Sequence, residues 1–431
     1  MRERIYICGF GASGEAVARL AARQGAEVTL VDRRDNPVEV ERCAGLAQLG
    51  VHIETGCSSA DPKGYDLCVL SPGVPVDSDW LVQRDVPLLS TMEYAWRFCE
   101  ARVIAVTGSN GKSTFVKLCA EALEASGARV AIAGNYGRPL ADVVCEGEPY
   151  DWIVLEVSSF QLETVNDFRP EIGVWLNLLP NHLDRHGSME LYGDLKARLF
   201  ANQKQGDRAI VGLDLEGRVA GAVTFGVGAG ATYRAVEGVI RSPNARADLV
   251  GTAFDRGVLA ETAAGVAAVL QACGVSLSHL EQAARGFRSL PHRLQVVGQV
   301  GEVSFIDDSK ATNLAALCAA VSSLSAPIRL IAGGILKEKD LESAKVLLVK
   351  HVVAVYLIGE AAEELAEAWG DRVPCTNSHV LSQAVSEAWR ESTPGDVILL
   401  SPGCASFDQF ANFADRGNAF LECVRALKKE K

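Results

Sequence analysis

Apolar and polar positions alternate along this chain in two different patterns. Short, nearly continuous apolar runs, such as Val352–Ile358 and Val397–Ser401, are separated by longer stretches in which apolar residues recur at helical spacing. Continuous apolar runs are typical of strands buried on both faces of a parallel sheet, and such a sheet needs helical crossovers between its strands. The pattern therefore predicts an α/β fold with mainly parallel sheets.

The chain divides into three blocks, and each opens with a strand, a glycine-containing turn and a helix. Its 431 residues exceed one domain of about 100–200 residues. We predict a Rossmann-like N-terminal domain over residues 1–93, a central domain with a mainly parallel sheet over 94–290, and a Rossmann-like C-terminal α/β domain over 291–431. Within the central domain, Val219–Arg246 is expected to form irregular strands. The clearest other expected elements are the strands Ile5–Gly9, Asp66–Leu70, Val103–Gly108, Trp152–Val157, Ile172–Leu176 and Ile328–Ala332, and the helices Phe115–Ser126, Ala260–Gly274, Ser278–Phe287 and Ala411–Lys429.

Composition narrows the classes of partner. The formal net charge of -12 argues against nucleic acid or an anionic membrane surface. The 12 cysteines include no CxxC pair, which favours reduced thiols over zinc or disulfides. No apolar stretch reaches the roughly 20 residues that span a bilayer, and the first residues lack a signal-peptide pattern. We expect no membrane insertion, a cytoplasmic location, and small molecules as partners of a monomer.

A candidate phosphate loop, Thr107–Thr114, lies between an apolar strand and a helix. Its sequence, TGSNGKST, is a short GxxGKS form of the phosphate loop. Such a loop turns its backbone N–H groups around phosphate oxygens, and the helix N-terminus that follows adds a partial positive charge. The pattern predicts a P-loop ATPase domain in which Lys112 approaches the β- and γ-phosphates and the hydroxyl of Ser113 binds Mg²⁺. The candidate ATP-binding residues here are Gly108, Ser109, Asn110, Gly111, Lys112, Ser113 and Thr114.

The magnesium site needs a carboxylate from a neighbouring strand. Glu156 ends the apolar run Trp152–Val157, and strand ends in parallel sheets face the ligand crevice. His182 follows the next strand and offers an imidazole, although a lone histidine in this position is more often structural.

A second glycine turn opens the chain. Gly9, Gly11 and Gly14 form a GxGxxG pattern between a strand and a helix, and Asp32 ends the next strand. This pattern predicts a bound nucleotide diphosphate, and read locally it indicates NAD. Arg33 and Arg34 are unusual for plain NAD recognition, so the nucleotide is not decided. Ser71, Pro72 and Gly73 follow another strand and offer a second contact to the diphosphate.

Two segments of the third block carry a more specific signal. One is Asp307–Asn313, DDSKATN, and the other is Ser401–Phe413, SPGCASFDQFANF, followed by Arg416 and Gly417. Together with the order of the three blocks, they make the whole chain resemble the Mur ligases, which build the peptide of bacterial cell-wall precursors. Within that family the two segments are similar to those of the member that adds D-glutamate.

The resemblance implies a reaction and its site residues. The reaction is ADP-forming ligation of D-glutamate to UDP-N-acetylmuramoyl-L-alanine through an acyl phosphate, with ATP and two Mg²⁺ ions. The implied catalytic residues are Lys112, His182, Lys196 and Arg293; ATP is also contacted by Asp308 and Lys310; and the metal ligands are Ser113, Glu156, His182 and Lys196 in carbamylated form. The implied UDP-substrate residues are Ser13, Asp32, Arg33, Arg34, Ser71, Pro72, Gly73 and Asn135, and the implied D-glutamate residues are Thr312, Lys337, Ser406 and Phe413.

The sequence departs from the family in two places. An asparagine-containing motif on the adenine side is absent, because the region reads Arg256–Thr262, RGVLAET, so no base contacts are assigned there. Asn181 precedes His182 where an acid is usual. Three other functions remain to be distinguished: a nicotinamide-dependent oxidoreductase, a non-catalytic UDP-sugar-binding homologue and a folate polyglutamate-type ligase. The first leaves Thr107–Thr114 unexplained, and the third-block segments argue against the last.

Overall fold

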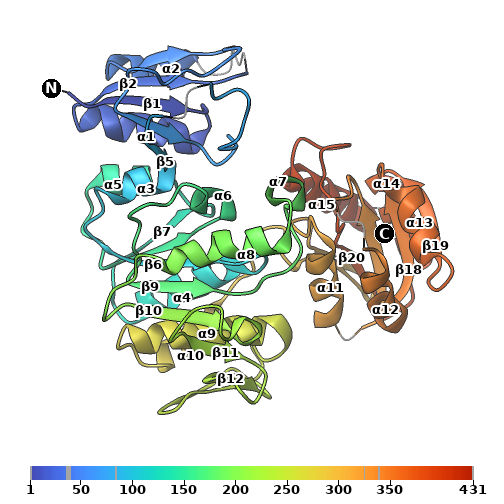
Figure 1. The fold of residues 1–431 in the computed structure, drawn as a ribbon. Coiled ribbons are helices and arrows are strands. Elements are labelled where there is room, and N and C mark those ends of the chain that lie inside the picture. Colours follow the sequence, from blue (N-terminus) through green and yellow to red (C-terminus); the bar gives the residue numbers. More distant parts are fainter. Residues whose placement is uncertain (1, 35–39, 83–84, 325, 338–339, 430–431) are drawn as a thin grey trace. The chain divides into compact units, whose positions relative to one another are not determined.

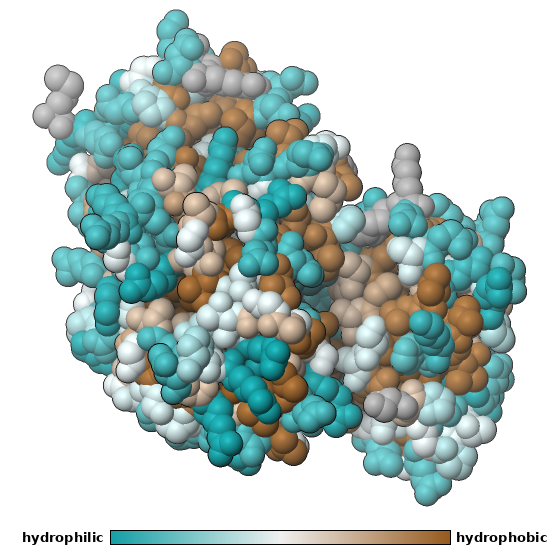
Figure 2. All heavy atoms as spheres, turned by 60° about the horizontal axis from the view of Figure 1, so that its bottom comes forward, coloured by the Kyte–Doolittle hydropathy of each residue, from teal (hydrophilic) through white to brown (hydrophobic). Residues whose placement is uncertain are grey.

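The computed structural model describes residues 2–34, 40–82, 85–324, 326–337 and 340–429 (Figure 1). These form two compact units. The first contains Met1–Leu178, Glu190–Thr252 and Glu261–Arg285, and the second contains Leu179–Met189, Ala253–Ala260 and Gly286–Lys431. In this part of the chain no helix is long and apolar enough to cross a membrane. Figure 2 shows hydrophilic side chains interspersed with apolar ones over the visible surface, as on most folded proteins.

The N-terminal sheet has five parallel strands in the order β3-β2-β1-β4-β5. The strands are β1 Arg4–Cys8, β2 Glu27–Val31, β3 His52–Glu54, β4 Leu67–Leu70 and β5 Leu88–Ser90, and the helices are α1 Ala12–Arg23, α2 Val40–Gln48 and α3 Thr91–Trp96. In β1 and β2 the last four residues are all buried, which explains their continuous apolar sequence. The parallel order confirms the Rossmann-like prediction and brings the carboxyl ends of β1, β2 and β4 to one edge.

The central sheet has nine strands in the order β14-β13-β12-β11-β10-β9-β6-β8-β7. They are β6 Arg102–Thr107, β7 Val130–Gly134, β8 Trp152–Glu156, β9 Ile172–Trp175, β10 Arg208–Gly212, β11 Val223–Gly226, β12 Tyr233–Val236, β13 Val239–Arg241 and β14 Arg246–Asp248. Pairing is parallel from β7 to β12 and antiparallel beyond, so a mainly parallel sheet and short strands within Val219–Arg246 were both predicted correctly. Between β6 and β15 the chain forms the helices α4 Lys112–Ala125, α5 Leu140–Glu146, α6 Ser159–Leu162, α7 Leu183–His186, α8 Met189–Ala197, α9 Gly257–Ala272 and α10 Ser278–Gly286, with single 3₁₀ turns at Arg198–Phe200 and Leu213–Leu215. Of these, α7 belongs to the second compact unit.

The first two sheets belong to one compact unit because polar and apolar contacts join them. The carboxylate of Glu93, which is fully buried, accepts hydrogen bonds from the backbone N–H groups of Asn166 (2.9 Å), Asp167 and Phe168 (3.0 Å). Arg19 on α1 bonds Asp142 on α5 at 2.6 Å, and one apolar cluster runs from α1 to the strands β6–β8. The N-terminal glycine turn and the phosphate loop therefore lie in one packed unit, while the proposed domain boundaries stay a prediction.

The C-terminal sheet has the order β15-β16-β20-β17-β18-β19, with only the β15–β16 pair antiparallel. Its strands are β15 Gln295–Val300, β16 Val303–Asp307, β17 Ile328–Gly333, β18 Val352–Ile358, β19 Cys375–His379 and β20 Val397–Leu400, and its helices are α11 Leu314–Ser323, α12 Glu342–His351, α13 Ala362–Trp369, α14 Leu381–Arg390 and α15 Phe413–Lys429. Neighbouring residues of β17 enter different cores: Leu330 packs into one apolar cluster and Ile331 into another. Both faces of the sheet are therefore covered, as the apolar runs predicted.

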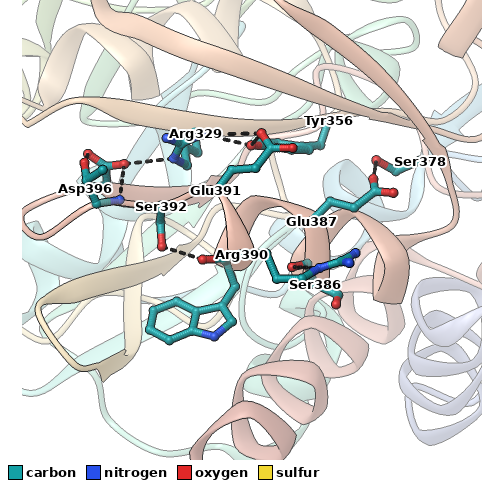
Figure 3. A network of polar contacts seen from close by, with 11 residues as sticks. Arg329, Tyr356, Ser378, Ser386, Glu387, Arg390, Glu391, Ser392 and Asp396 are labelled. Carbon is teal, nitrogen blue, oxygen red and sulfur yellow. Dashed lines mark hydrogen bonds and ion pairs between the residues drawn. The ribbon is translucent and has the colours of Figure 1, made fainter.

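A polar network in which Arg329 and Asp396 are buried lies beside the amino ends of β17 and β20 (Figure 3). Arg329, near the start of β17, donates to Asp396 at 2.8 Å and to the hydroxyl of Tyr356 at 2.9 Å, and Tyr356 donates to Glu391 at 2.6 Å. Ligands bind parallel sheets at the carboxyl ends of the strands. The network therefore stabilises the edge of this sheet that lies away from the predicted site.

Candidate functional site

The phosphate loop has the conformation that its glycines predict. β6 ends at Thr107 and α4 begins at Lys112, with Gly111 in the left-handed region at φ 84°. A Cβ on Gly108 would lie 2.9 Å from the Cβ of Leu176, so no side chain fits there. The ammonium of Lys112 donates to the carbonyls of Gly108 (2.8 Å) and Ser109 (3.0 Å). The lysine thus lies over the loop, at the N-terminus of α4 where a phosphate is favoured.

Glu156 and Ser113 are brought together as predicted. Glu156 is 2% exposed at the end of β8, which neighbours β6. One carboxylate oxygen accepts from the hydroxyl of Ser113 at 2.6 Å, and the other accepts from the side-chain amide of Asn135 at 2.9 Å. The sequence placed Asn135 near the sugar substrate, and the structure adds this contact to the carboxylate.

These oxygens fit magnesium. Mg²⁺ prefers hard oxygen ligands and commonly takes only one or two carboxylates, the rest being water and substrate phosphates. Within the described ranges no group of three or more His, Cys, Asp or Glu side chains forms a complete metal cage. A carboxylate beside a serine hydroxyl next to a phosphate loop is the donor set that a nucleotide-bound magnesium ion needs.

Lys196 is buried against the phosphate loop, although a lysine side chain in water carries a positive charge. It sits on α8, is 1% exposed, and donates to the carbonyl of Gly108 at 3.0 Å. Its ammonium lies 4.4 Å from the ring centre of Tyr192, one helical turn earlier. Burial, together with the charge of Lys112, lowers the pKa of Lys196 well below its usual value. A lower pKa leaves more of the neutral amine, and the neutral amine is the form that reacts with carbon dioxide.

His182 belongs to the second unit. It has a left-handed backbone at φ 55° and directly precedes α7. A non-glycine residue in that region is uncommon and often marks a functional position. Its role as a magnesium ligand stays a prediction.

The N-terminal glycine turn is held by Asp32. The carboxylate of Asp32, at the end of β2, accepts from the N–H of Phe10 at 2.7 Å and of Arg34 at 2.8 Å. Burial raises the pKa of Asp32, but these N–H groups and the guanidinium of Arg34 outweigh it, so the pKa lies below its usual value. A Cβ on Gly14 would lie 2.0 Å from the carbonyl oxygen of Gly9, which makes glycine obligatory there.

Apart from Asn135, which contacts Glu156, the other predicted UDP-substrate residues belong to the segments at this edge of the N-terminal sheet. The hydroxyl of Ser71, after β4, donates to the carbonyl of Gly9 at 2.9 Å, so the segment continuing into Pro72 and Gly73 lies beside the turn. Ser13 lies in the first turn of α1, and Arg33 and Arg34 are exposed beyond β2. The sheet edge therefore carries the segments that the glycine pattern predicted, and their contacts with a ligand stay a prediction.

In the second unit, Asp308 follows β16 and is buried. Its carboxylate accepts from the N–H of Leu294 at 3.1 Å and from the hydroxyl of Ser401 at 2.9 Å. Burial raises its pKa to about 7, against the lowering effect of Ser401, Leu294 and Arg293. Lys310 lies with its ammonium 3.8 Å from the ring centre of Phe413. Asp308 thus lies beside the segment that carries Arg293.

The sequence did not single out His292, which braces Arg293. His292 has φ 60° and Leu294 has φ 45°, so two left-handed residues flank Arg293. The ring of His292 bonds the buried carboxylate of Asp307 at 2.7 Å, and a Cβ on Gly417 would lie 2.1 Å from this ring. Glycine is therefore needed at position 417, directly after Arg416, so that the ring of His292 can bond Asp307 and hold the turn.

The four predicted D-glutamate residues follow three strands at one edge of the C-terminal sheet, three of them on loops and Phe413 at the start of α15. Thr312 follows β16, Lys337 follows β17, and Ser406 and Phe413 follow β20, and these strands are neighbours in the order β16-β20-β17. The loops are tied together by paired N–H···O bonds of 2.9 Å between Ile335 and Ala405. These bonds join the segments after β17 and β20, and the binding of D-glutamate by the four residues stays a prediction.

A buried arginine underlies these loops. Arg416 on α15 is 1% exposed and donates to the hydroxyl of Ser309 (3.0 Å) and to the carbonyls of Ser309 (2.9 Å) and Cys404 (3.1 Å). Burial lowers its pKa to about 10. Arg416 joins the loops after β16 and β20, and apart from the Ser309 hydroxyl its partners are backbone carbonyls that a sequence pattern does not reveal.

Comparison with known proteins places these features in a family. The Mur ligase middle domain matches residues 106–254, and the Mur ligase, glutamate ligase domain matches residues 292–404. A UDP-N-acetylmuramoylalanine–D-glutamate ligase from Acidobacterium capsulatum is 37% identical, with 98% of this chain and 96% of that protein covered. The ligase of the same name from Oleidesulfovibrio alaskensis is 38% identical over 99% of this chain and 94% of its own.

The fold is also that of solved Mur ligase structures. The MurF ligase from Thermotoga maritima in complex with ADP superimposes with a TM-score of 0.65 at 16% identity, covering 100% of this chain and 96% of that one. At that identity the likeness shows the fold alone. The identity of 37–38% to the UDP-N-acetylmuramoylalanine–D-glutamate ligases extends over nearly the whole chain and shows more than the fold. The chain belongs to the Mur ligase family, with these D-glutamate ligases as its relatives.

Proposed function

We propose that this chain is an ATP-dependent ligase that joins D-glutamate to UDP-N-acetylmuramoyl-L-alanine in peptidoglycan precursor synthesis. The observation that carries the proposal is the phosphate loop, with Lys112 over its carbonyls and Glu156 bonded to Ser113, in a chain more than a third identical to such ligases over nearly its whole length. The oxidoreductase alternative does not account for this loop.

The reaction needs ATP because a carboxylate does not react with an amine directly. An oxygen of the L-alanine carboxylate attacks the γ-phosphorus, the bond to the bridging oxygen of ADP breaks, and an acyl phosphate forms. The amine of D-glutamate then attacks the acyl carbon, loses a proton, and phosphate leaves with the carboxylate oxygen. Lys112 and Arg293 carry fixed positive charges that offset the charge spread over the phosphoryl oxygens.

Magnesium would be held by the side chains already in contact beside the loop. Ser113 and Glu156 supply a hydroxyl and a carboxylate to an ion on the nucleotide, and Lys196 as a carbamate and His182 would supply a second ion. When bound, Mg²⁺ would offset the negative charge of the nucleotide phosphates. Before it binds, Asn135 keeps the carboxylate of Glu156 oriented by donating to it at 2.9 Å.

The three substrates would bind at separate sheet edges. The UDP part would lie at the glycine turn, held by Ser13, the segment after β2 (Asp32, Arg33 and Arg34) and the segment after β4 (Ser71, Pro72 and Gly73). D-glutamate would bind among Thr312, Lys337, Ser406 and Phe413, with the ammonium of Lys337 paired to a carboxylate. ATP would contact Arg293, Asp308 and Lys310 in addition to the phosphate loop. We further propose that the enzyme acts as a cytoplasmic monomer, which light scattering would test.

Phosphate release tests the proposal. Purified protein with ATP and Mg²⁺ should release phosphate only when UDP-N-acetylmuramoyl-L-alanine and D-glutamate are both present, and L-glutamate should not replace D-glutamate. A pteroate acceptor in place of the UDP-linked acceptor tests the folate-type alternative and should give no release. Hydrolysis of ATP at the same rate with and without the two substrates would contradict the proposal. Tight binding of the UDP substrate without turnover would favour the non-catalytic homologue.

A further inference from the structure

Asn177 contacts the phosphate loop from a neighbouring strand. It follows β9, which pairs with β6 in the central sheet and brings Trp175 beside Thr107. The side-chain oxygen of Asn177 accepts from the backbone N–H groups of Ser109 and Asn110, at 3.0 Å each. Its side-chain nitrogen donates to the carbonyl of Asn110 at 3.2 Å. One amide therefore bonds three main-chain groups of the loop.

Asn177 is itself fixed by its main chain. Its carbonyl accepts from the indole N–H of the fully buried Trp175 at 3.1 Å and from the N–H of Ser109 at 3.2 Å. The two N–H donors also identify the side-chain oxygen as the atom that faces them, because an amide nitrogen cannot accept hydrogen bonds. The side chain is thus held in one orientation by a rigid strand end.

The geometry of the loop at Ser109 decides where Lys112 lies. The ammonium of Lys112 donates to the carbonyls of Gly108 and Ser109, which directly precede the N–H groups held by Asn177. A rotation of the peptide between Ser109 and Asn110 would turn one of these carbonyls away. Without the amide of Asn177, the N–H and carbonyl of Asn110 lose these bonds and the N–H of Ser109 keeps only the longer one to the main-chain carbonyl of residue 177, so the loop gains conformations that do not fit a phosphate.

We propose that Asn177 is a positioning residue that holds the phosphate loop in the shape that binds ATP. The proposal rests on the ATP-dependent function above and extends it to a residue that contacts the loop but that the sequence patterns do not assign. Asn177 acts on the nucleotide through Ser109 and Asn110, so its loss affects nucleotide binding and leaves the UDP-substrate and D-glutamate sites as they are.

The test compares Asn177→Ala with a matched asparagine variant. Asn202 also donates through its side chain to backbone carbonyls of the same compact unit, those of Asn166 (2.8 Å) and Phe168 (3.2 Å), and makes Asn202→Ala the control. The affinity for ADP is measured by calorimetry, and KM is measured for each substrate. Asn177→Ala should weaken ADP binding and raise KM for ATP about tenfold, the loss expected for two or three hydrogen bonds. Its kcat and its other KM values should stay within about twofold, and Asn202→Ala should leave all of them unchanged.

A second variant guards against misfolding. Asn177→Asp keeps the shape and an acceptor oxygen for Ser109 and Asn110, loses the donor to the Asn110 carbonyl, and should fold while binding ADP more weakly. Unchanged ADP affinity in both variants would overturn the proposal, as would tighter ADP binding, which would make Asn177 a competitor of the phosphate. Parallel changes in every KM, like those of a merely destabilised control, would also overturn it. Because ADP binding does not involve the acceptor, this outcome is separate from a failure of the ligase assay.

Discussion

Removal of carbon dioxide should inactivate this enzyme through Lys196. An unperturbed lysine has a pKa of about 10.4, so at pH 7.5 only about one molecule in a thousand carries the neutral amine. The structure moves this balance strongly, because Lys196 is 1% exposed and its pKa is lowered by burial and by the charge of Lys112. Each unit of lowering raises the neutral fraction about tenfold, until the amine is mostly neutral. The site therefore favours the reaction in which the amine adds carbon dioxide and releases a proton to give a carbamate.

The assay follows turnover in buffers stripped of carbon dioxide and then resupplied with bicarbonate. We expect kcat to fall at least about tenfold when carbon dioxide is depleted in the absence of Mg²⁺, because the proposed carbamate ligand would be lost, and to recover with bicarbonate. Lys196→Met keeps the volume of the side chain without the amine, so it should fold normally and be inactive with or without bicarbonate. Full activity of the depleted wild-type enzyme, or substantial turnover by Lys196→Met, would refute the reasoning.

Three further predictions address the other parts of the structure. Lys112→Ala should lower kcat at least about a thousandfold yet leave the UDP substrate bound with unchanged affinity in calorimetry, because the glycine turn is a separate site; loss of both would contradict that division. Asp308 has a pKa of about 7 when folded and an ordinary one when unfolded, so the folded chain binds more protons between about pH 4 and 7. The free energy of unfolding should therefore fall as pH rises through that window, by at most about 4 kcal/mol, and urea unfolding of Asp308→Asn should show a flatter dependence. Arg329→Met leaves the buried Asp396 without its cation and should cost about 3 kcal/mol of stability without changing any KM, and a changed KM for D-glutamate would show that the two edges of the sheet are coupled.

The parts of the fold that the sequence predicted well are those that depend on local pattern. The strand Val352–Ile358 was expected with the bounds that the structure gives to β18, because its residues are almost all buried and apolar. Glu156 was placed correctly because it is the charged residue at the carboxyl end of an apolar strand, where a parallel sheet faces its ligand. Helix α4 begins at Lys112, earlier than the expected Phe115, because Gly111 turns the chain directly into the helix.

The residues to which sequence reasoning assigned no role act mainly through main-chain groups that come from distant segments. Arg416 bonds carbonyls of Ser309 and Cys404, and Asn177 bonds the loop at Ser109. Most of these partners are main-chain groups, so no spacing of residue types along the chain reveals the contacts. Lys196 was named only through the family resemblance, because its sequence neighbourhood resembles an ordinary helix, and burial under the phosphate loop is what gives it an unusual amine.

The central claim, ligation through an acyl phosphate, is tested most directly with an acceptor whose alanine carboxylate carries ¹⁸O. Mass spectrometry of one reaction with ATP, Mg²⁺ and D-glutamate reads both the product and the released phosphate. We predict that the product gains the mass of one glutamate and loses one ¹⁸O atom and two hydrogens. The lost ¹⁸O should appear as one labelled oxygen in each released phosphate. Phosphate without ¹⁸O, or label transferred to AMP, would contradict the account.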